Sequence, residues 1–127
     1  MRGLLQDWID LEGTGTGEII QSGAKWPNLD GYQDVAFWLD VAMVTSVSTE
    51  LRMHYQTAPV SEPTLFSDMV TDFPMSASAT AVVTNVYLSS NPLVPLSGMI
   101  RWRITAVAGG AWKVTFRINY IAKRRGS

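Results

Sequence analysis

The chain has 127 residues, of which 46% are hydrophobic and 17% charged, with a formal net charge of −1 and a pI of about 5.7. This composition is typical of one globular domain and excludes disorder, and the absence of cysteine excludes disulfides, thiolate zinc sites and cysteine nucleophiles. No apolar run reaches the roughly 18 residues of a membrane helix, the first residues are too polar for a signal peptide, and the acidic pI is atypical of a dedicated nucleic-acid binder.

The first predicted element is an arm at residues 1–17. It begins with an apolar patch made of Leu4, Leu5, Trp8, Ile9 and Leu11. Glycine then alternates with threonine over 13–17, a composition typical of a flexible hinge, and no Lys-Ser/Thr follows to make a phosphate-binding loop. We expect the patch either to fold back on its own sheet or to dock on a neighbouring subunit.

Apolar residues then recur with the alternation of β-strands. The predicted strands lie at 35–44, 51–56, 79–88, 100–105 and 112–120. The first of them is apolar on both faces, so we expect it to be covered on both sides. Clusters of Pro, Asn and Gly predict turns between the strands, and 62–70 predicts one short helix with Ser61 as its N-cap.

Six or seven strands at this spacing predict an all-β antiparallel sandwich, jelly-roll-like, with an extended N-terminal arm. We expect the arm and hinge at 1–17, the sandwich domain at 18–122 and a basic C-terminal tail at 123–127, which suits an acidic partner.

The last two strands allow a prediction of register. A three-residue loop at 108–110, or a longer loop in the same register, would pair Ile104 with Val114 and Trp102 with Phe116, so that both inward faces agree. Arg101 would then lie opposite Arg117 on the outer face, together with Arg103. Because opposed like charges are unfavourable, we expect acidic side chains to neutralise them. The candidates are Asp34, Asp40, Glu50 and the N-terminal Asp7, Asp10, Glu12 and Glu18.

The small net charge conceals a separation along the chain. Residues 1–100 hold eleven acidic and three basic side chains, a net charge of −8, whereas residues 101–127 hold seven basic side chains and no acid. Three interpretations remain open: neutralisation within one fold, head-to-tail contact between subunits, and a tail for nucleic acid.

Residues for catalysis or metal binding are sparse. His54 is the only histidine, and zinc needs three or four ligands. Asp30 and Asp34 lack the pattern of a calcium loop, and no nucleophile elbow accompanies the serines. We therefore predict no enzyme activity, no metal, no cofactor and no small-molecule ligand.

Three tryptophans lie outside the predicted core and are candidates for contact surfaces, where tryptophan contributes much of the binding energy. Together with the apolar patch and the basic residues they form our predicted interface set. Its members are Leu4, Leu5, Trp8, Ile9, Trp26, Trp38, Arg101, Arg103, Arg117, Arg124 and Arg125.

Several segments resemble small jelly-roll structural proteins of tailed-phage virions. They read GYQDV at 31–35, FWLDV at 37–41, YQTAP at 55–59, LF at 65–66 and IRWR at 100–103. The resemblance implies a head decoration (cement) protein or similar component, found in virions assembled in the host cytoplasm. It implies self-association and binding to a major capsid or other virion protein, without cofactor or membrane. The alternative is a carbohydrate-binding sandwich that uses Trp38 or Trp26 and a loop calcium.

Overall fold

The strands of the chain follow its alternating apolar residues. The computed structural model describes residues 1–46, 50–77, 79–86, 93–107 and 109–124. Within these residues the strands are β1 (Arg2–Thr14), β2 (Gly17–Ile20), β3 (Asp34–Ser46), β4 (Glu50–Ala58), β5 (Ser67–Asp68), β6 (Phe73–Pro74), β7 (Val82–Asn85), β8 (Met99–Val107) and β9 (Ala111–Lys123). Two 3-10 turns accompany them, η1 (Gly23–Lys25) and η2 (Pro63–Leu65).

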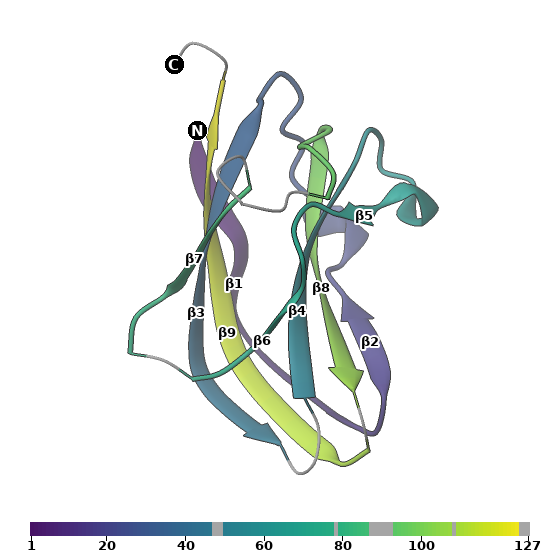
Figure 1. Cartoon of the computed structure of the whole chain (residues 1–127), viewed down its shortest axis with the longest axis vertical. Helices are drawn as coiled ribbons and strands as arrows, with labels where there is room; N and C mark the ends of the chain where they lie inside the picture. Colours follow the sequence, from purple (N-terminus) through teal and green to yellow (C-terminus); the bar gives the residue numbers. More distant parts are fainter. Residues whose placement is uncertain (47–49, 78, 87–92, 108, 125–127) are drawn as a thin grey trace.

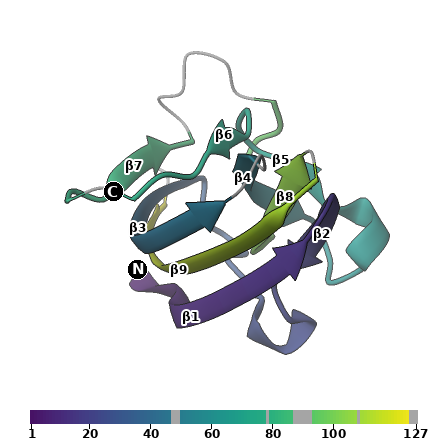
Figure 2. The ribbon, with the colours of Figure 1, turned by 90° about the horizontal axis from the view of Figure 1, so that it is seen from below.

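The strands form two antiparallel sheets that pack against each other (Figures 1 and 2). Sheet A has the order β1-β9-β3-β7, and sheet B has the order β2-β8-β4-β5, with β6 also paired to β4. The first strand therefore neighbours the last, and the second neighbours the last but one. Two sheets linked in this nested order form a jelly roll. The predicted all-β antiparallel sandwich is confirmed.

The core is formed by the inward side chains of both sheets. Phe37 of β3 stacks on Tyr55 of β4, with ring centroids 4.0 Å apart. Trp102 of β8 meets Phe116 of β9 edge-on at 5.2 Å. All four side chains are buried, so these two aromatic pairs fix the sheets against each other.

The predicted ladder between the last two strands is wrong. β8 lies between β2 and β4 in sheet B, whereas β9 lies between β1 and β3 in sheet A. Trp102 and Phe116 are both buried, as predicted, but they meet across the interior of the sandwich. Arg101 and Arg117 consequently lie on opposite sheets and do not share a face. Alternation identifies the buried face of a strand but leaves open whether the next strand pairs with it or packs against it.

Three local predictions also need correction. The outer face of β3 is half-buried rather than covered, as Ala36, Trp38 and Asp40 show. The strand predicted at 79–88 is β7, limited to Val82–Asn85, and 87–88 lie outside the described residues. The predicted helix is the single turn η2, capped by Glu62 instead of Ser61, because the chain then pairs with β4 through β5.

The N-terminal segment folds back on its own sheet, one of the two expectations. β1 pairs with β9 from Arg2 to Thr14, with register shifts on either side of Gln6. Leu5 is buried, whereas Leu4 and Trp8 are exposed. The terminal amine of Met1 also donates to the carbonyl of Ala122 at 3.0 Å. The segment predicted as an arm is thus an edge strand of sheet A.

Candidate functional site

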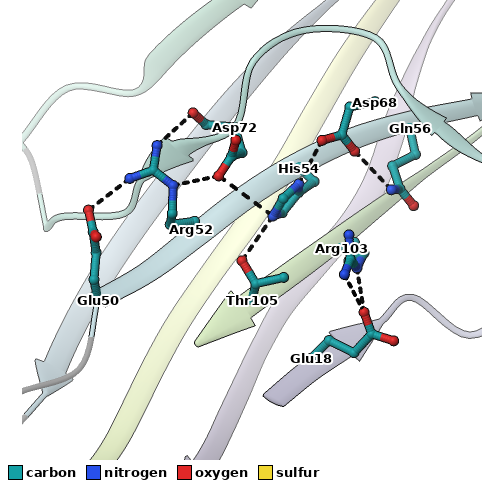
Figure 3. Close-up of polar contacts among 9 residues, drawn as sticks. All are labelled: Glu18, Glu50, Arg52, His54, Gln56, Asp68, Asp72, Arg103 and Thr105. Atoms are coloured by element: carbon teal, nitrogen blue, oxygen red, sulfur yellow. Dashed lines mark hydrogen bonds and ion pairs between the residues drawn. The ribbon is translucent and has the colours of Figure 1, made fainter. Parts of the chain in front are cut away.

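The outer face of sheet B carries a polar cluster (Figure 3). Alternate residues of β4 and β8 project there, and the register sets His54 opposite Arg103 and Gln56 opposite Arg101. Asp68 of β5 and Asp72, which precedes β6, approach from the segments that pair with the far side of β4. The cluster therefore joins side chains from four separate parts of the chain.

His54 lies at the centre of this cluster and is only 7% exposed. Its Nδ1 lies 2.9 Å from Oδ2 of Asp68, and its Nε2 lies 2.9 Å from Oγ1 of Thr105. In the neutral tautomer with Nδ1 protonated, the ring donates to the carboxylate and accepts from the hydroxyl. Both ring nitrogens are engaged, so His54 connects β4 to β5 and β8.

Arginine–carboxylate pairs surround the histidine. Arg52 donates to Asp72 through Nε and to Glu50 through Nη1, the latter at 2.8 Å. On the other side Arg103 pairs with Glu18 of β2. These pairs are partly exposed and screened by water, so each contributes little to stability, but together they cover the outer side of the sheet.

Asp68 is the carboxylate held most firmly in the cluster. Its Oδ1 accepts from Nε2 of Gln56 at 2.8 Å and its Oδ2 from His54. Burial raises the pKa of the Asp68 carboxyl, but the hydrogen bonds from His54 and Gln56 outweigh burial, so the pKa lies below its ordinary value.

This lowered pKa predicts a pH-dependent contribution to stability. A carboxyl with a lower pKa in the folded state stabilises the fold above its unfolded-state pKa, about 3.9, and the contribution is lost as the pH falls through the folded-state pKa. Asp68→Asn is therefore expected to lower the free energy of unfolding at pH 6 by about 1 kcal/mol, with the difference from the native chain shrinking towards pH 2. Urea unfolding across this range measures it. A difference that stays constant with pH would contradict the assignment.

The same cluster contains three groups able to ligate a metal. The ligating atoms of His54, Asp68 and Asp72 all lie within 4.8 Å of one another. The charges do not suit a cation, however, because Arg52 already pairs with Asp72 and both nitrogens of His54 already have hydrogen-bond partners. A closed zinc site also needs a fourth ligand. The arrangement fits a hydrogen-bonded clamp better than a metal centre.

Arg101 lies beside this cluster and is only 5% exposed. Its guanidinium carbon lies 4.0 Å from the ring centroid of Phe66 and 5.1 Å from that of Trp26, and its Nε donates to Oε1 of Gln56 at 2.9 Å. Its Nη1 finds no hydrogen-bond partner among the described residues. Burial lowers the pKa of Arg101, and the nearby charge of Arg103 lowers it further. Arg101 and Trp26 thus pack within the fold, although both belong to the predicted interface set.

The outer face of sheet A holds four of the other predicted interface residues, Leu4, Trp8, Trp38 and Arg117. Leu4 is 50% exposed and Trp8 46%. The guanidinium carbon of Arg117 lies 4.8 Å from the ring centroid of Trp8, while its Nε donates to Asp40 at 2.7 Å. Trp38 is half-buried between two open hollows of about 470 and 250 Å³.

The remaining predicted residues are placed differently. Leu5 is buried in the core, and Ile9 is half-buried against it. Arg124 lies over the ring of Tyr32, and Arg125 lies outside the described residues.

Two of the predicted acidic partners do neutralise arginines of the predicted interface set, Asp40 for Arg117 and Glu18 for Arg103, and both act within the chain. Sequence reasoning missed Asp68 and Asp72, and it gave Phe66, which lies in the resembling segment 65–66, no role at a site. No charge pattern marks the two aspartates.

Comparison with known proteins identifies the fold and no family. No protein-family model matches the chain, and no curated protein sequence matches it. A chain in the structure of infectious bursal disease virus, Gx strain, is similar over 100% of this chain and 33% of its own, with 13% identity and a TM-score of 0.54. VP2 in the subviral particle of the same virus matches over 98% of this chain and 37% of its own, with 9% identity and a TM-score of 0.38.

The chain therefore spans about a third of the length of the solved chains it resembles. At 13% identity, the first of these likenesses shows that the two chains share a fold. Within the residues that the structure describes, no helix has both the length and the hydropathy to span a membrane.

Proposed function

We propose that the chain is a non-enzymatic structural subunit of a virus particle. The observation that carries this proposal is the jelly-roll sandwich. All of this chain matches a part, 33%, of a chain of infectious bursal disease virus. The assignment to a tailed phage, as a decoration or tail component, rests on the sequence resemblance. In this role the chain self-associates and docks on a larger virion protein.

The two outer faces support different roles in such a particle. The face of sheet B is occupied by its own ion pairs and by the buried His54 and Arg101. The face of sheet A exposes Leu4 and Trp8, and large apolar side chains at a surface are typical of contacts with another protein. We assign self-association to sheet A.

The direct test is the composition of purified particles from the phage that encodes the chain. Mass spectrometry with labelled peptide standards should count the copies of this chain in each particle. That number should be a whole multiple of the number of symmetry-equivalent positions in the particle. Deleting its gene should yield particles that lose stability or fail to assemble. Absence of the chain from purified particles would overturn the proposal.

A carbohydrate-binding role is the second candidate, favoured by the position of Trp38. Trp38 lines both hollows on sheet A; Asp40 and Asn119 line the larger and Asn85 the smaller. Aromatic faces beside polar groups suit sugar rings. The loop calcium is not supported, because among the described residues Asp30 and Asp34 belong to no cluster of three ligating groups. Glycan-array binding that is lost in Trp38→Ala would favour this role.

A further inference from the structure

We infer that the outer face of sheet A binds a second copy of this chain, face to face, about a two-fold axis that runs across the strands. The inference deepens the proposed function by naming one partner and its geometry, and it rests on that function only for its biological purpose. The contact itself is a property of the isolated chain.

The centre of this face is apolar. The registers set Leu4 and Trp38 on either side of Asn119, and Val83 beyond Trp38, so these residues form one row across all four strands. Leu4 is 50% exposed and Val83 55%. Trp8 follows in the next row, over Arg117. These side chains form an apolar band from the exposed Leu4 and Trp8 on β1, across the half-buried Trp38, to the exposed Val83 on β7, interrupted only by Asn119 of β9.

The two ends of the face carry opposite charge along β1. Arg2 lies beside Ile121 at one end, and Asp10 and Glu12 lie beside Thr115 and Lys113 at the other. The polarity is therefore basic at the start of the strand and acidic at its end, with the apolar band between them.

This polarity selects the symmetry of a face-to-face dimer. An isologous contact brings the same surface of both copies together about a two-fold axis in the plane of contact. An axis parallel to the strands would lay β1 of one copy against β7 of the other, and β7 (Val82–Asn85) has no acidic side chain for Arg2. An axis across the strands opposes Arg2 to Asp10 and Glu12 of the other copy, and keeps the apolar bands in contact. Electrostatic complementarity favours the second arrangement.

The size of the face also suits a dimer. Three strands of 13 residues and the four-residue β7, spaced about 4.8 Å apart with about 3.3 Å per residue, give a flat area of roughly 700 Å² before side-chain relief is counted. Standard interfaces bury about 800 Å² of accessible surface on each partner. The face is thus of the order needed, provided that the contact uses nearly all of it.

Pairing through the edge of β1 is a less suitable route to the same dimer. Its register shifts twice, between Leu4 and Gln6 and between Gln6 and Ile9. Such bulges interrupt the row of backbone groups that another strand would pair with. The contact is therefore assigned to the side chains of the face.

The experiment measures dimerisation of the full chain by sedimentation velocity between about 1 and 300 µM. Val83→Lys should raise the dissociation constant at least about 100-fold, because it places a charge within the apolar band. Val60→Lys is the matched control, since Val60 is 53% exposed on the loop after β4, and it should leave the constant unchanged. Circular dichroism of both variants checks that the sandwich is folded.

Charge variants test the axis. Arg2→Glu should weaken the dimer by about tenfold, and Arg2→Glu combined with Glu12→Arg should restore it. An axis parallel to the strands would leave the constant nearly unchanged in both variants, because β1 would then lie opposite β7 of the other copy and residues 2 and 12 would not meet. A dimer equally weakened by Val60→Lys would overturn the assignment of the face.

The outcomes separate this inference from the proposed function. A chain that stays monomeric at 300 µM but is present in particles overturns the dimer and leaves the virion role standing. If the dimer forms as described but the chain is absent from particles, the dimer stands and the virion role is overturned.

Discussion

Trp102→Ala is expected to lower the free energy of unfolding by about 3–5 kcal/mol, the range for removing a large buried aromatic side chain. Trp102 is buried and lies edge-on to Phe116 of the opposite sheet at 5.2 Å. Its indole N–H also donates to Oε1 of Gln6 on β1 at 3.1 Å. The substitution leaves a cavity between the sheets and an amide on β1 without its partner. Urea unfolding measures the loss.

A double-mutant cycle isolates the contact across the sandwich. Trp102→Leu and Phe116→Leu should couple by about 0.5–1.5 kcal/mol, the worth of an aromatic pair beyond its buried area. Val107→Ala, on an exposed side chain of the same strand β8, should change stability by less than about 0.5 kcal/mol. Additive effects of the two core substitutions would contradict the contact.

Gly13→Ala is expected to destabilise the fold by about 1–3 kcal/mol, as overpacking does. A Cβ at Gly13 would meet the indole of Trp112 at 2.6 Å, and Trp112 is itself buried. Gly17→Ala is the matched control from the same Gly/Thr segment, since a Cβ there meets nothing within 4 Å. It should be neutral or slightly stabilising, because alanine restricts the unfolded chain. Equal effects of the two substitutions would instead support a hinge whose only requirement is flexibility.

These glycines illustrate what the sequence could not supply. Alternating Gly and Thr at 13–17 predicts flexibility, yet Gly13 lies in β1 opposite Trp112, where the lack of a side chain makes room for a ring. Only Gly15, with φ of +81° in the turn between β1 and β2, has the backbone role that glycine suggests. Composition shows that these residues are small. Only the fold shows that the ring of Trp112 occupies the space beside Gly13.

The strands themselves were more predictable than their neighbours. Alternation correctly placed the inward faces of Trp102 and Phe116, because burial of one side chain in two is a local property of the sequence. Whether β8 pairs with β9 is a property of the whole chain, and it depends on β1, β2, β3 and β4 occupying the flanking positions.

The candidate site shows the same limit. Alternation along 51–56 places His54 on the polar face of β4, but its burial comes from Asp68 and neighbouring residues that reach it through irregular backbone. The predicted register of the last two strands led to the expectation that acidic side chains would neutralise the arginines. It could not foresee that Glu18 and Asp40 would do so on opposite sheets.

The neighbouring positions of β1 and β9 impose an order on folding. The hydrogen bond from Met1 to Ala122 joins residues 121 positions apart. The pairing of β1 from Arg2 to Thr14 is likewise made with β9, the last strand. During synthesis β1 emerges long before β9 exists, so it must remain unpaired until nearly the whole sandwich has been made. Contacts of such sequence separation slow folding and expose strand edges meanwhile. Two nascent chains held close together could therefore exchange their first strands, which makes the rate of synthesis itself a determinant of the yield of correctly folded monomer.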